Sequence, residues 1–168
     1  MSDKKVALIV GGGSGIAAGA ARKLAENGFD VAVMSSSGRG EALANEHGGL
    51  GFTGSNLNPD DLKKFVDLAM DRWGRIDAVV NGAGHGPKGP ILAISDEDWQ
   101  LGMEYYLLNV IRMTRLVAPI MQRQKSGSIV NITTLATRKP MPGEGGYAMA
   151  KSAVNQLSRQ LAVELAGT

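Results

Sequence analysis

Residues 6–20 have the sequence VALIVGGGSGIAAGA, in which five apolar residues lead directly into a cluster of glycines. The β-branched and large apolar residues of Val6–Val10 predict a strand that is buried on both faces. From Gly15 onward, apolar residues recur at helical spacing, which predicts a helix over Gly15–Asn27. A buried strand, a glycine turn and a helix in this order form the first unit of a parallel α/β fold.

The remainder of the chain repeats this alternation of short strands and longer amphipathic helices. Further strands are expected at Val31–Met34, Leu50–Thr53, Asp77–Val80 and Ser128–Thr133. Further helices are expected at Gly40–His47, from Asn58 to about Trp73, from Asp96 to about Gln124 in two pieces, and at Tyr147–Ala166. The alternation predicts a Rossmann-type doubly wound parallel sheet, which is a three-layer α/β/α fold. No repeat or linker interrupts it, so residues 1–168 are expected to form a single domain.

The composition narrows the possible classes of function. The chain has 168 residues and a formal net charge of +2, and its charges are scattered, which argues against a nucleic-acid partner. It contains no cysteine, so disulfides and thiolate chemistry are excluded. The apolar run at Val6–Val10 is too short for a signal sequence or a membrane span, so we expect a cytoplasmic protein without a membrane partner. No group of His, Asp and Glu residues has the spacing of a metal site.

The glycine turn between the first strand and the first helix predicts a nucleotide site. A dinucleotide pyrophosphate requires a closely approaching backbone, free amide groups and the positive end of a helix. Glycine permits the approach, and a helix that opens at Gly15 provides the amides. No Gly-Lys-Ser/Thr follows, which excludes a Walker-type phosphate loop. The alternative is a plain strand-to-helix turn. The expected contacts are Gly11, Gly13, Ser14, Gly15 and Ile16.

The end of the second strand is expected to meet the adenosine ribose of the nucleotide. A carboxylate there would bind the 2′-hydroxyl and repel a 2′-phosphate. This chain has instead Ser35, Ser36 and Ser37, followed by Gly38 and Arg39, and no acid. Hydroxyls and an arginine suit a phosphate, so we expect NADP as cofactor rather than NAD. The alternative is that Arg39 is only a solvated loop charge.

A tyrosine and a lysine lie one helical turn apart at the start of the last predicted helix. Tyr147 and Lys151 are four residues apart and therefore share a helix face. A free tyrosine has a pKa of about 10, and a nearby cation favours the phenolate and lowers that value. Such a pair arises by chance in many helices. Its position after the fifth strand, downstream of a nucleotide turn, makes it a candidate acid/base pair.

Four segments together resemble the short-chain dehydrogenase/reductase family. They are Val10-Gly11-Gly12-Gly13-Ser14-Gly15-Ile16-Ala17 at the turn, Asn81-Gly82-Ala83-Gly84 after the fourth strand, Asn109 within Leu107-Leu108-Asn109-Val110, and Tyr147 with Lys151. They occur in the family's order at plausible spacings, and the resemblance covers essentially every residue. It implies an oxidoreductase that transfers a hydride between a nicotinamide and a ketone or alcohol.

The resemblance also implies roles for individual residues. Tyr147 would exchange a proton with the substrate oxygen, and Lys151 would lower the tyrosine pKa and hold the nicotinamide ribose. Asn109 would position a water in a proton relay. The other implied cofactor contacts are Asn81, Gly82, Ala83 and Gly84 after the fourth strand, and Ser55 and Asn56 after the third. The implied partners are a small carbonyl or alcohol substrate and further copies of the chain, in homodimers or homotetramers formed through helices near 104–124 and 147–166.

The sequence departs from the family at several points. Thr134 stands thirteen residues before Tyr147, where the family usually has a catalytic serine. Its hydroxyl has the same donors and acceptors as serine, so the resemblance implies that Thr134 is catalytic and that activity survives, although its extra methyl crowds the substrate oxygen. Val10 and Ala17 replace the threonine and the last glycine of the turn. Thr134 and the short length of the chain leave a second interpretation open, in which the chain is a catalytically silent nucleotide-binding or scaffold protein on the same fold.

The length is the largest departure from the family. Its members usually have two more strands and a lid helix after the helix that contains the tyrosine, and these are expected to be absent here. The fifth strand would then have an open edge, which favours pairing or aggregation. Three explanations are open: a fragment of a longer protein, a natural short form that binds cofactor without turnover, or a partner chain that supplies the edge.

Overall fold

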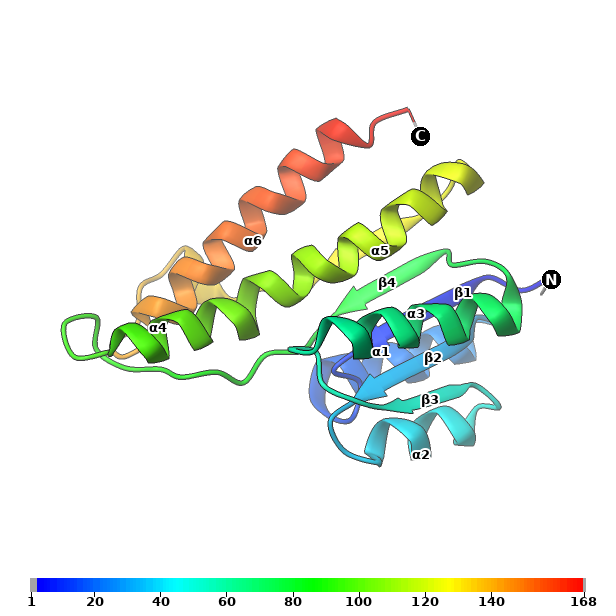
Figure 1. Cartoon of the computed structure of the whole chain (residues 1–168), viewed down its shortest axis with the longest axis horizontal. Coiled ribbons are helices and arrows are strands. Elements are labelled where there is room, and N and C mark those ends of the chain that lie inside the picture. The colour runs from blue at the N-terminus through cyan, green and yellow to red at the C-terminus, as the bar shows by residue number, and fades with distance from the viewer. Residues whose placement is uncertain (1–2, 168) are drawn as a thin grey trace.

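A computed structural model describes residues 3–167. Within this range, parallel strands form one sheet in the order β3-β2-β1-β4-β5, and helices pack on it (Figure 1). The strands are β1 (Val6–Val10), β2 (Asp30–Ser35), β3 (Leu50–Thr53), β4 (Ala78–Asn81) and β5 (Ser128–Asn131). The α-helices are α1 (Gly15–Glu26), α2 (Arg39–Glu46), α3 (Pro59–Trp73), α4 (Asp96–Met103), α5 (Asn109–Gln124) and α6 (Gly145–Glu164). This arrangement confirms the predicted Rossmann-type α/β fold.

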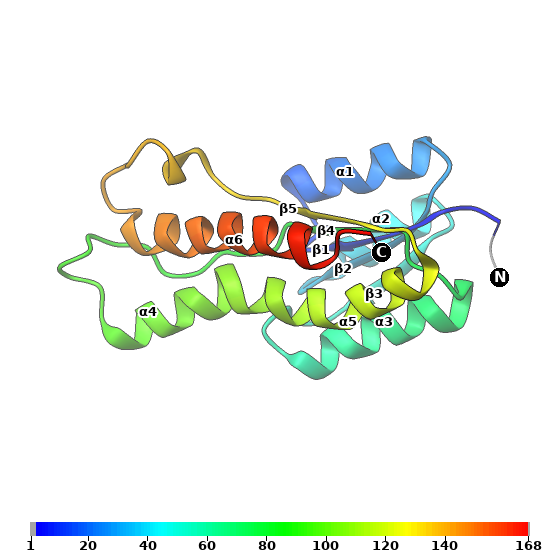
Figure 2. The same cartoon turned by 90° about the horizontal axis from the view of Figure 1, so that it is seen from above.

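Two hydrophobic cores lie on opposite faces of the sheet. On one face, Ala17, Ala18 and Ala21 of α1 and Leu43 of α2 pack on alternate residues of β1 and β2. On the other face, α3 and α5 cover the same strands with larger side chains. Figure 2 shows α1 on one side of the sheet and α3 with α5 on the other. The small side chains of α1 let that helix approach the sheet closely, which brings its first turn near the carboxyl ends of the strands.

β5 differs from β1, whose residues are all buried as predicted, because every second residue of β5 is exposed. Ser128 and Val130 of β5 are exposed, with Val130 at 50% of its full accessibility. Both residues pair with Ala78 and Val80 and so lie on the face of the sheet that α1 covers, and the core under α1 includes no residue of β5. β5 also ends at Asn131, two residues earlier than predicted.

The long helical segment after β4 is in two pieces, as predicted. A π-helical turn, η1 (Glu104–Leu108), joins α4 to α5. The wider turn allows Tyr106 to point inward, where it is 1% exposed. A short 3₁₀ turn, η2 (Leu135–Thr137), follows β5.

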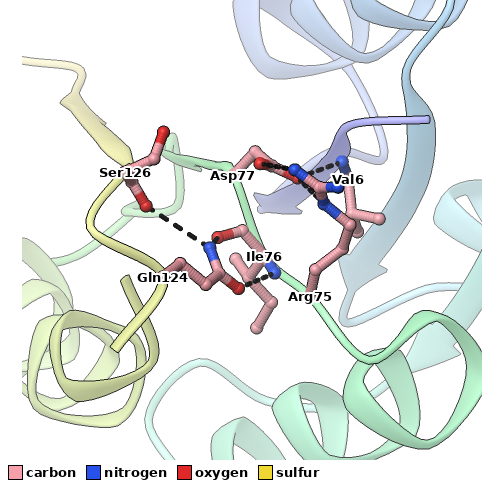
Figure 3. Close-up of polar contacts among 6 residues, drawn as sticks. All are labelled: Val6, Arg75, Ile76, Asp77, Gln124 and Ser126. Atoms are coloured by element: carbon pink, nitrogen blue, oxygen red, sulfur yellow. Dashed lines mark hydrogen bonds and ion pairs between the residues drawn. The ribbon is translucent and has the colours of Figure 1, made fainter. Parts of the chain in front are cut away.

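A polar network ties the amino ends of the strands together (Figure 3). Asp77 accepts hydrogen bonds from the backbone N–H of Val6 and from Arg75, at 2.8 Å for each contact to Oδ2. The side chain of Gln124 pairs with both backbone groups of Ile76, at 3.0 and 2.7 Å. This network joins β1, the start of β4 and the end of α5 at the end of the sheet opposite to the predicted site.

Candidate functional site

One large cavity lies beyond the carboxyl ends of β1, β2 and β4. Its volume is about 1010 Å³, and both the glycine turn and Tyr147 line it. The strand order reverses between β1 and β4, and such a switch point is where open α/β sheets bind ligands. The lining residues predicted from the sequence are Gly11, Gly13, Ser14, Gly15, Ile16, Ser35, Ser36, Ser37, Arg39, Asn56, Gly82, Ala83, Gly84 and Tyr147.

The backbone of the glycine turn is held close to the segment after β4. The amides of Gly11 and Gly12 both donate to the carbonyl of Met34 at 2.9 Å. Gly11 has φ of +79°, and a Cβ there would lie 2.6 Å from the Cα of Ala83. A side chain is therefore excluded at Gly11 by conformation and by space. The turn keeps the cavity floor free of side chains.

The first turn of α1 is suited to an anion. Its N-cap residue, Ser14, makes no side-chain capping hydrogen bond, and the turn contains no acidic residue. In contrast, Asn58 caps α3 and Ser95 caps α4, and both of those helices have acidic residues in their first turn. The amides that open α1 thus lack the internal partners that satisfy α3 and α4. A diphosphate at this position would meet free donors and the positive end of the helix dipole.

An unpaired donor lies at the far end of the same cavity. The amide nitrogen Nδ2 of Asn56 is buried without a hydrogen-bond partner, and Asn56 lines the cavity beyond β3. A buried polar group without a partner is costly, so a ligand acceptor at this position would be favoured. Together with the α1 amides, Asn56 gives the cavity the donors that a dinucleotide requires at both ends.

The ring of Tyr147 is packed between two other side chains. Tyr106 meets it edge to face, with ring centroids 4.7 Å apart and an angle of 68° between the planes. The Nζ atom of Lys88 lies 4.5 Å from the centroid of the Tyr147 ring. Lys88 and Tyr106 both line the cavity, and no sequence motif marked either of them as a site residue.

Lys151 is buried one helical turn after Tyr147. Its Nζ donates to the carbonyl of Ile132 at 3.0 Å and lies 6.0 Å from the centroid of the Tyr106 ring. Burial lowers the pKa of Lys151, because the charged ammonium is removed from water. The side chain is thus held beneath the tyrosines rather than in the open cavity.

Comparison with known proteins decides the family. The short chain dehydrogenase family model matches residues 5–168. The chain belongs to this family. A 3-oxoacyl-[acyl-carrier-protein] reductase from Synechocystis sp. is 33% identical, over 96% of this chain and 68% of that protein. The human dehydrogenase/reductase SDR family member 4 is 32% identical, over 96% of this chain and 61% of that protein.

The structure of another dehydrogenase supports the same conclusion. It is a 7α-hydroxysteroid dehydrogenase in complex with NADH and 7-oxo glycochenodeoxycholic acid. The match has a TM-score of 0.88 and 28% identity, and it covers 97% of this chain and 66% of that one. The chain thus spans about two thirds of the length of these relatives. The predicted family, the fold class and the enzyme class of NAD(P)-dependent oxidoreductase are confirmed.

Several predicted site residues of this short-chain dehydrogenase do not line the cavity. The side-chain Nδ2 of Asn81 donates to Oδ1 of Asn131 at 2.8 Å, which joins β4 to β5. Asn109 is 3% exposed at the start of α5, and its Oδ1 accepts from the amide of Val110. Ser55 makes its contacts within its own loop, where its amide donates to the carboxylate of Asp61 at 2.8 Å.

Thr134 also lies apart from the cavity that Tyr147 lines. Its Oγ1 accepts from the amide of Ala136 at 3.2 Å and so caps η2. It lines a separate cavity of about 860 Å³ between η2 and α6, together with Ser152 and Asn155. The structure therefore does not bring the Thr134 hydroxyl to the face on which Tyr147 meets the glycine turn.

Within residues 3–167, no helix is both long and apolar enough to span a membrane. The same range contains no group of His, Asp and Glu side chains arranged to hold a metal ion.

Proposed function

We propose that this short-chain dehydrogenase interconverts a ketone and an alcohol, with NADP as cofactor and Tyr147 as the acid/base. The single observation that carries this proposal is the shared cavity, in which the glycine turn and the Tyr147 side chain face the same space. The relatives named above include a 3-oxoacyl reductase and a hydroxysteroid dehydrogenase. Both names describe chemistry at a carbonyl or alcohol carbon.

The roles of the residues follow from their contacts. The nicotinamide, when bound, supplies or accepts the hydride. Tyr147 gives a proton to the substrate oxygen during reduction and takes it back during oxidation. Lys151 stabilises the phenolate through its charge, because its ammonium is buried one turn from Tyr147. Asn81 supports the end of β4 beside the cofactor, and Asn109 positions a water in the proton relay; both side chains are buried.

The proposed choice of NADP depends on the end of β2. Ser36, Ser37 and Arg39 line the cavity there, and Nε of Arg39 donates to Oγ of Ser37 at 3.3 Å. No acidic residue stands among them to repel a 2′-phosphate. A guanidinium beside hydroxyls is a suitable phosphate site.

Removing the Arg39 guanidinium tests this cofactor preference. In Arg39→Ala, the Kd for NADPH should rise about tenfold because a charge-assisted contact is lost, while the Kd for NADH should change less than about twofold. Both are measured by the fluorescence enhancement of the reduced cofactor. Arg22→Ala, on the exposed side of α1, is the matched control and should change neither value. Equal weakening of NADPH and NADH, or tighter binding of NADH by the unmodified protein, would contradict the assignment.

The whole proposal is tested by a screen of carbonyl compounds with the full natural protein. NADPH absorbance is followed with ketones and aldehydes of several classes, including 3-oxoacyl thioesters and oxosteroids. Consumption of NADPH that depends on a carbonyl compound supports the proposal. Binding of NADPH without consumption on any compound favours the second candidate.

The second candidate is a catalytically silent nucleotide-binding or scaffold protein on the same fold. It is favoured by Thr134, whose hydroxyl caps η2 and does not line the cavity of Tyr147. The cofactor donors at α1 and Asn56 are expected in both candidates. Only a measurement of carbonyl-dependent NADPH consumption distinguishes the two candidates.

We also propose that copies of the chain pair through the helices near 104–124 and 147–166. Support comes from α6, which leaves Met149 and Val163 exposed at 53% and 74%. A dimer or tetramer is expected to cover these side chains. Light scattering of the purified protein measures its mass and therefore the number of copies.

A further inference from the structure

The loop that follows β4, residues 82–95, brings a lysine onto the ring of Tyr147. Lys88 Nζ lies 4.5 Å from the ring centroid, and the lysine lines the same cavity as the glycine turn. A cation at this distance from an aromatic face is attracted by the negative face of the ring. The contact therefore restrains the orientation of the ring.

Lys88 is held in turn by the residue that precedes α6. Its Nζ donates to Oε1 of Glu144 at 2.8 Å, and the backbones at Gly89 and Glu144 form an isolated parallel bridge. The hydrogen bond to Glu144 raises the pKa of Lys88 and outweighs the opposite effect of partial burial, so the ammonium stays charged at neutral pH. Glu144 lies three residues before Tyr147 in the chain and is the N-cap residue of α6. The ion pair therefore holds the Lys88 ammonium beside the start of the helix that carries Tyr147.

Tyr106 holds the Tyr147 ring from a second direction. It meets that ring edge to face and is itself 1% exposed. Its hydroxyl donates to the carbonyl of Gly86 at 2.6 Å and accepts from the amide of Gly86 at 2.8 Å. Burial raises the pKa of Tyr106, so it remains a neutral phenol that can donate this bond. The loop that carries Lys88 thus also fixes Tyr106.

We propose that Lys88 is a positioning residue that holds the Tyr147 ring against Tyr106, so that the phenol faces the cavity shared with the glycine turn. This inference rests on the proposed function, in which Tyr147 exchanges a proton with the substrate. If Lys88 only formed an ion pair at the surface, its ammonium would need no contact with an aromatic ring. Here the same ammonium contacts both the Glu144 carboxylate and the Tyr147 ring.

The first test is kinetic. Lys88→Met keeps a long, unbranched side chain but removes the charge that contacts the ring and Glu144. Its kcat should fall about tenfold, because the Tyr147 phenol is no longer held in the orientation that proton transfer requires. The Kd for NADPH should change less than about twofold. Lys88→Arg keeps a cation on the ring and should restore most of kcat. A drop in kcat that Lys88→Arg does not restore, or no drop in Lys88→Met, would overturn the inference.

The second test requires no turnover. Labelling with 3-fluorotyrosine gives a ¹⁹F resonance for Tyr147, and Tyr147→Phe identifies it by its loss. Lys88→Met should shift this resonance, and Lys88→Arg should return it toward its original position. The matched control is Lys64→Met, because Lys64 lies 5.8 Å from the Phe52 ring and makes a similar contact elsewhere. It should leave the Tyr147 resonance unchanged.

The two tests separate this inference from the proposed function. An unmoved resonance in Lys88→Met shows that Lys88 does not hold the ring, whether or not the protein turns over. A shifted resonance with unchanged kcat shows that the contact has no positioning role. An unmodified protein that consumes no NADPH with any carbonyl compound contradicts the proposed function, and the resonance still decides whether Lys88 orients Tyr147.

Discussion

Replacing Tyr147 by phenylalanine in the full natural protein should abolish carbonyl-dependent NADPH consumption. Loss of a general acid/base typically costs between about a hundredfold and ten-thousandfold, and we expect kcat to fall by about a thousandfold. The phenylalanine ring keeps the contacts with Tyr106 and Lys88 that the tyrosine ring makes. The Kd for NADPH should therefore change less than about twofold, which fluorescence titration measures.

A second phenol in the same cavity supplies the control. Tyr105 lines the cavity as Tyr147 does, but it belongs to η1 rather than to α6. Tyr105→Phe should retain kcat within about threefold, because it removes a hydroxyl without removing the proposed acid/base. Retained turnover in Tyr147→Phe, or an equal loss in Tyr105→Phe, would refute the assignment of Tyr147.

Replacing Asp77 by alanine should lower the free energy of unfolding by about 2–3 kcal/mol, because a charged acceptor with three hydrogen bonds is removed from a buried position. The Asp77 side chain is 5% exposed. The change leaves the amide of Val6 and the guanidinium of Arg75 without this partner (Figure 3). Urea unfolding followed by circular dichroism measures the loss. NADPH affinity should be nearly unchanged, since the network lies at the opposite end of the sheet from the cavity.

The contribution of Asp77 should also depend on pH in a defined direction. Burial acts to raise the pKa of Asp77, but the hydrogen bonds from Arg75 and Val6 outweigh it and hold the pKa below its usual value. A carboxyl with a lowered pKa in the folded state stabilises the fold above its unfolded pKa of about 3.9. That stability is lost as the pH falls through the folded value. The difference in unfolding free energy between the unmodified protein and Asp77→Asn should therefore shrink below about pH 4.

An exposed aspartate provides the matched control for both measurements. Asp67 pairs with Lys63 on the surface of α3, where the two side chains are 52% and 63% exposed. Asp67→Asn should cost less than about 0.5 kcal/mol, because exposed ion pairs contribute little. An Asp77→Ala protein as stable as Asp67→Asn would contradict the proposed importance of the network.

The fold and much of the cavity follow from local signals in the sequence. Residues that line the cavity at the glycine turn were predictable because a turn between a buried strand and a helix fixes its own geometry. Tyr147 was predictable for a similar reason, since it lies in the first turn of the helix that follows the fifth strand. Strand ends shifted by one or two residues, as at Asn81 and Asn131. Such ends depend on hydrogen bonds between strands rather than on residue type.

The residues that the sequence could not place depend on contacts distant along the chain. Lys88 lies in a loop without periodicity, and its partner Glu144 is 56 residues away. Thr134 was assigned by its spacing from Tyr147, but a 3₁₀ turn intervenes and uses its hydroxyl as a cap. Ser55 and Asn56 were predicted together, whereas only Asn56 lines the cavity, because the amide of Ser55 is tied to Asp61. Only the structure shows that the Nδ2 atom of Asn56 is buried without a hydrogen-bond partner.

The π-helical turn at Glu104–Leu108 has a consequence for the evolution of the chain. An α-helix advances about 100° per residue, so a single-residue deletion in this turn would rotate α5 by that angle relative to α4. Tyr106 would leave its place beside Gly86, and Asn109 would turn to another face. Insertions and deletions should therefore be rejected at 104–108, even where substitutions are accepted. The exposed residues 139–142 should tolerate changes in length far more readily.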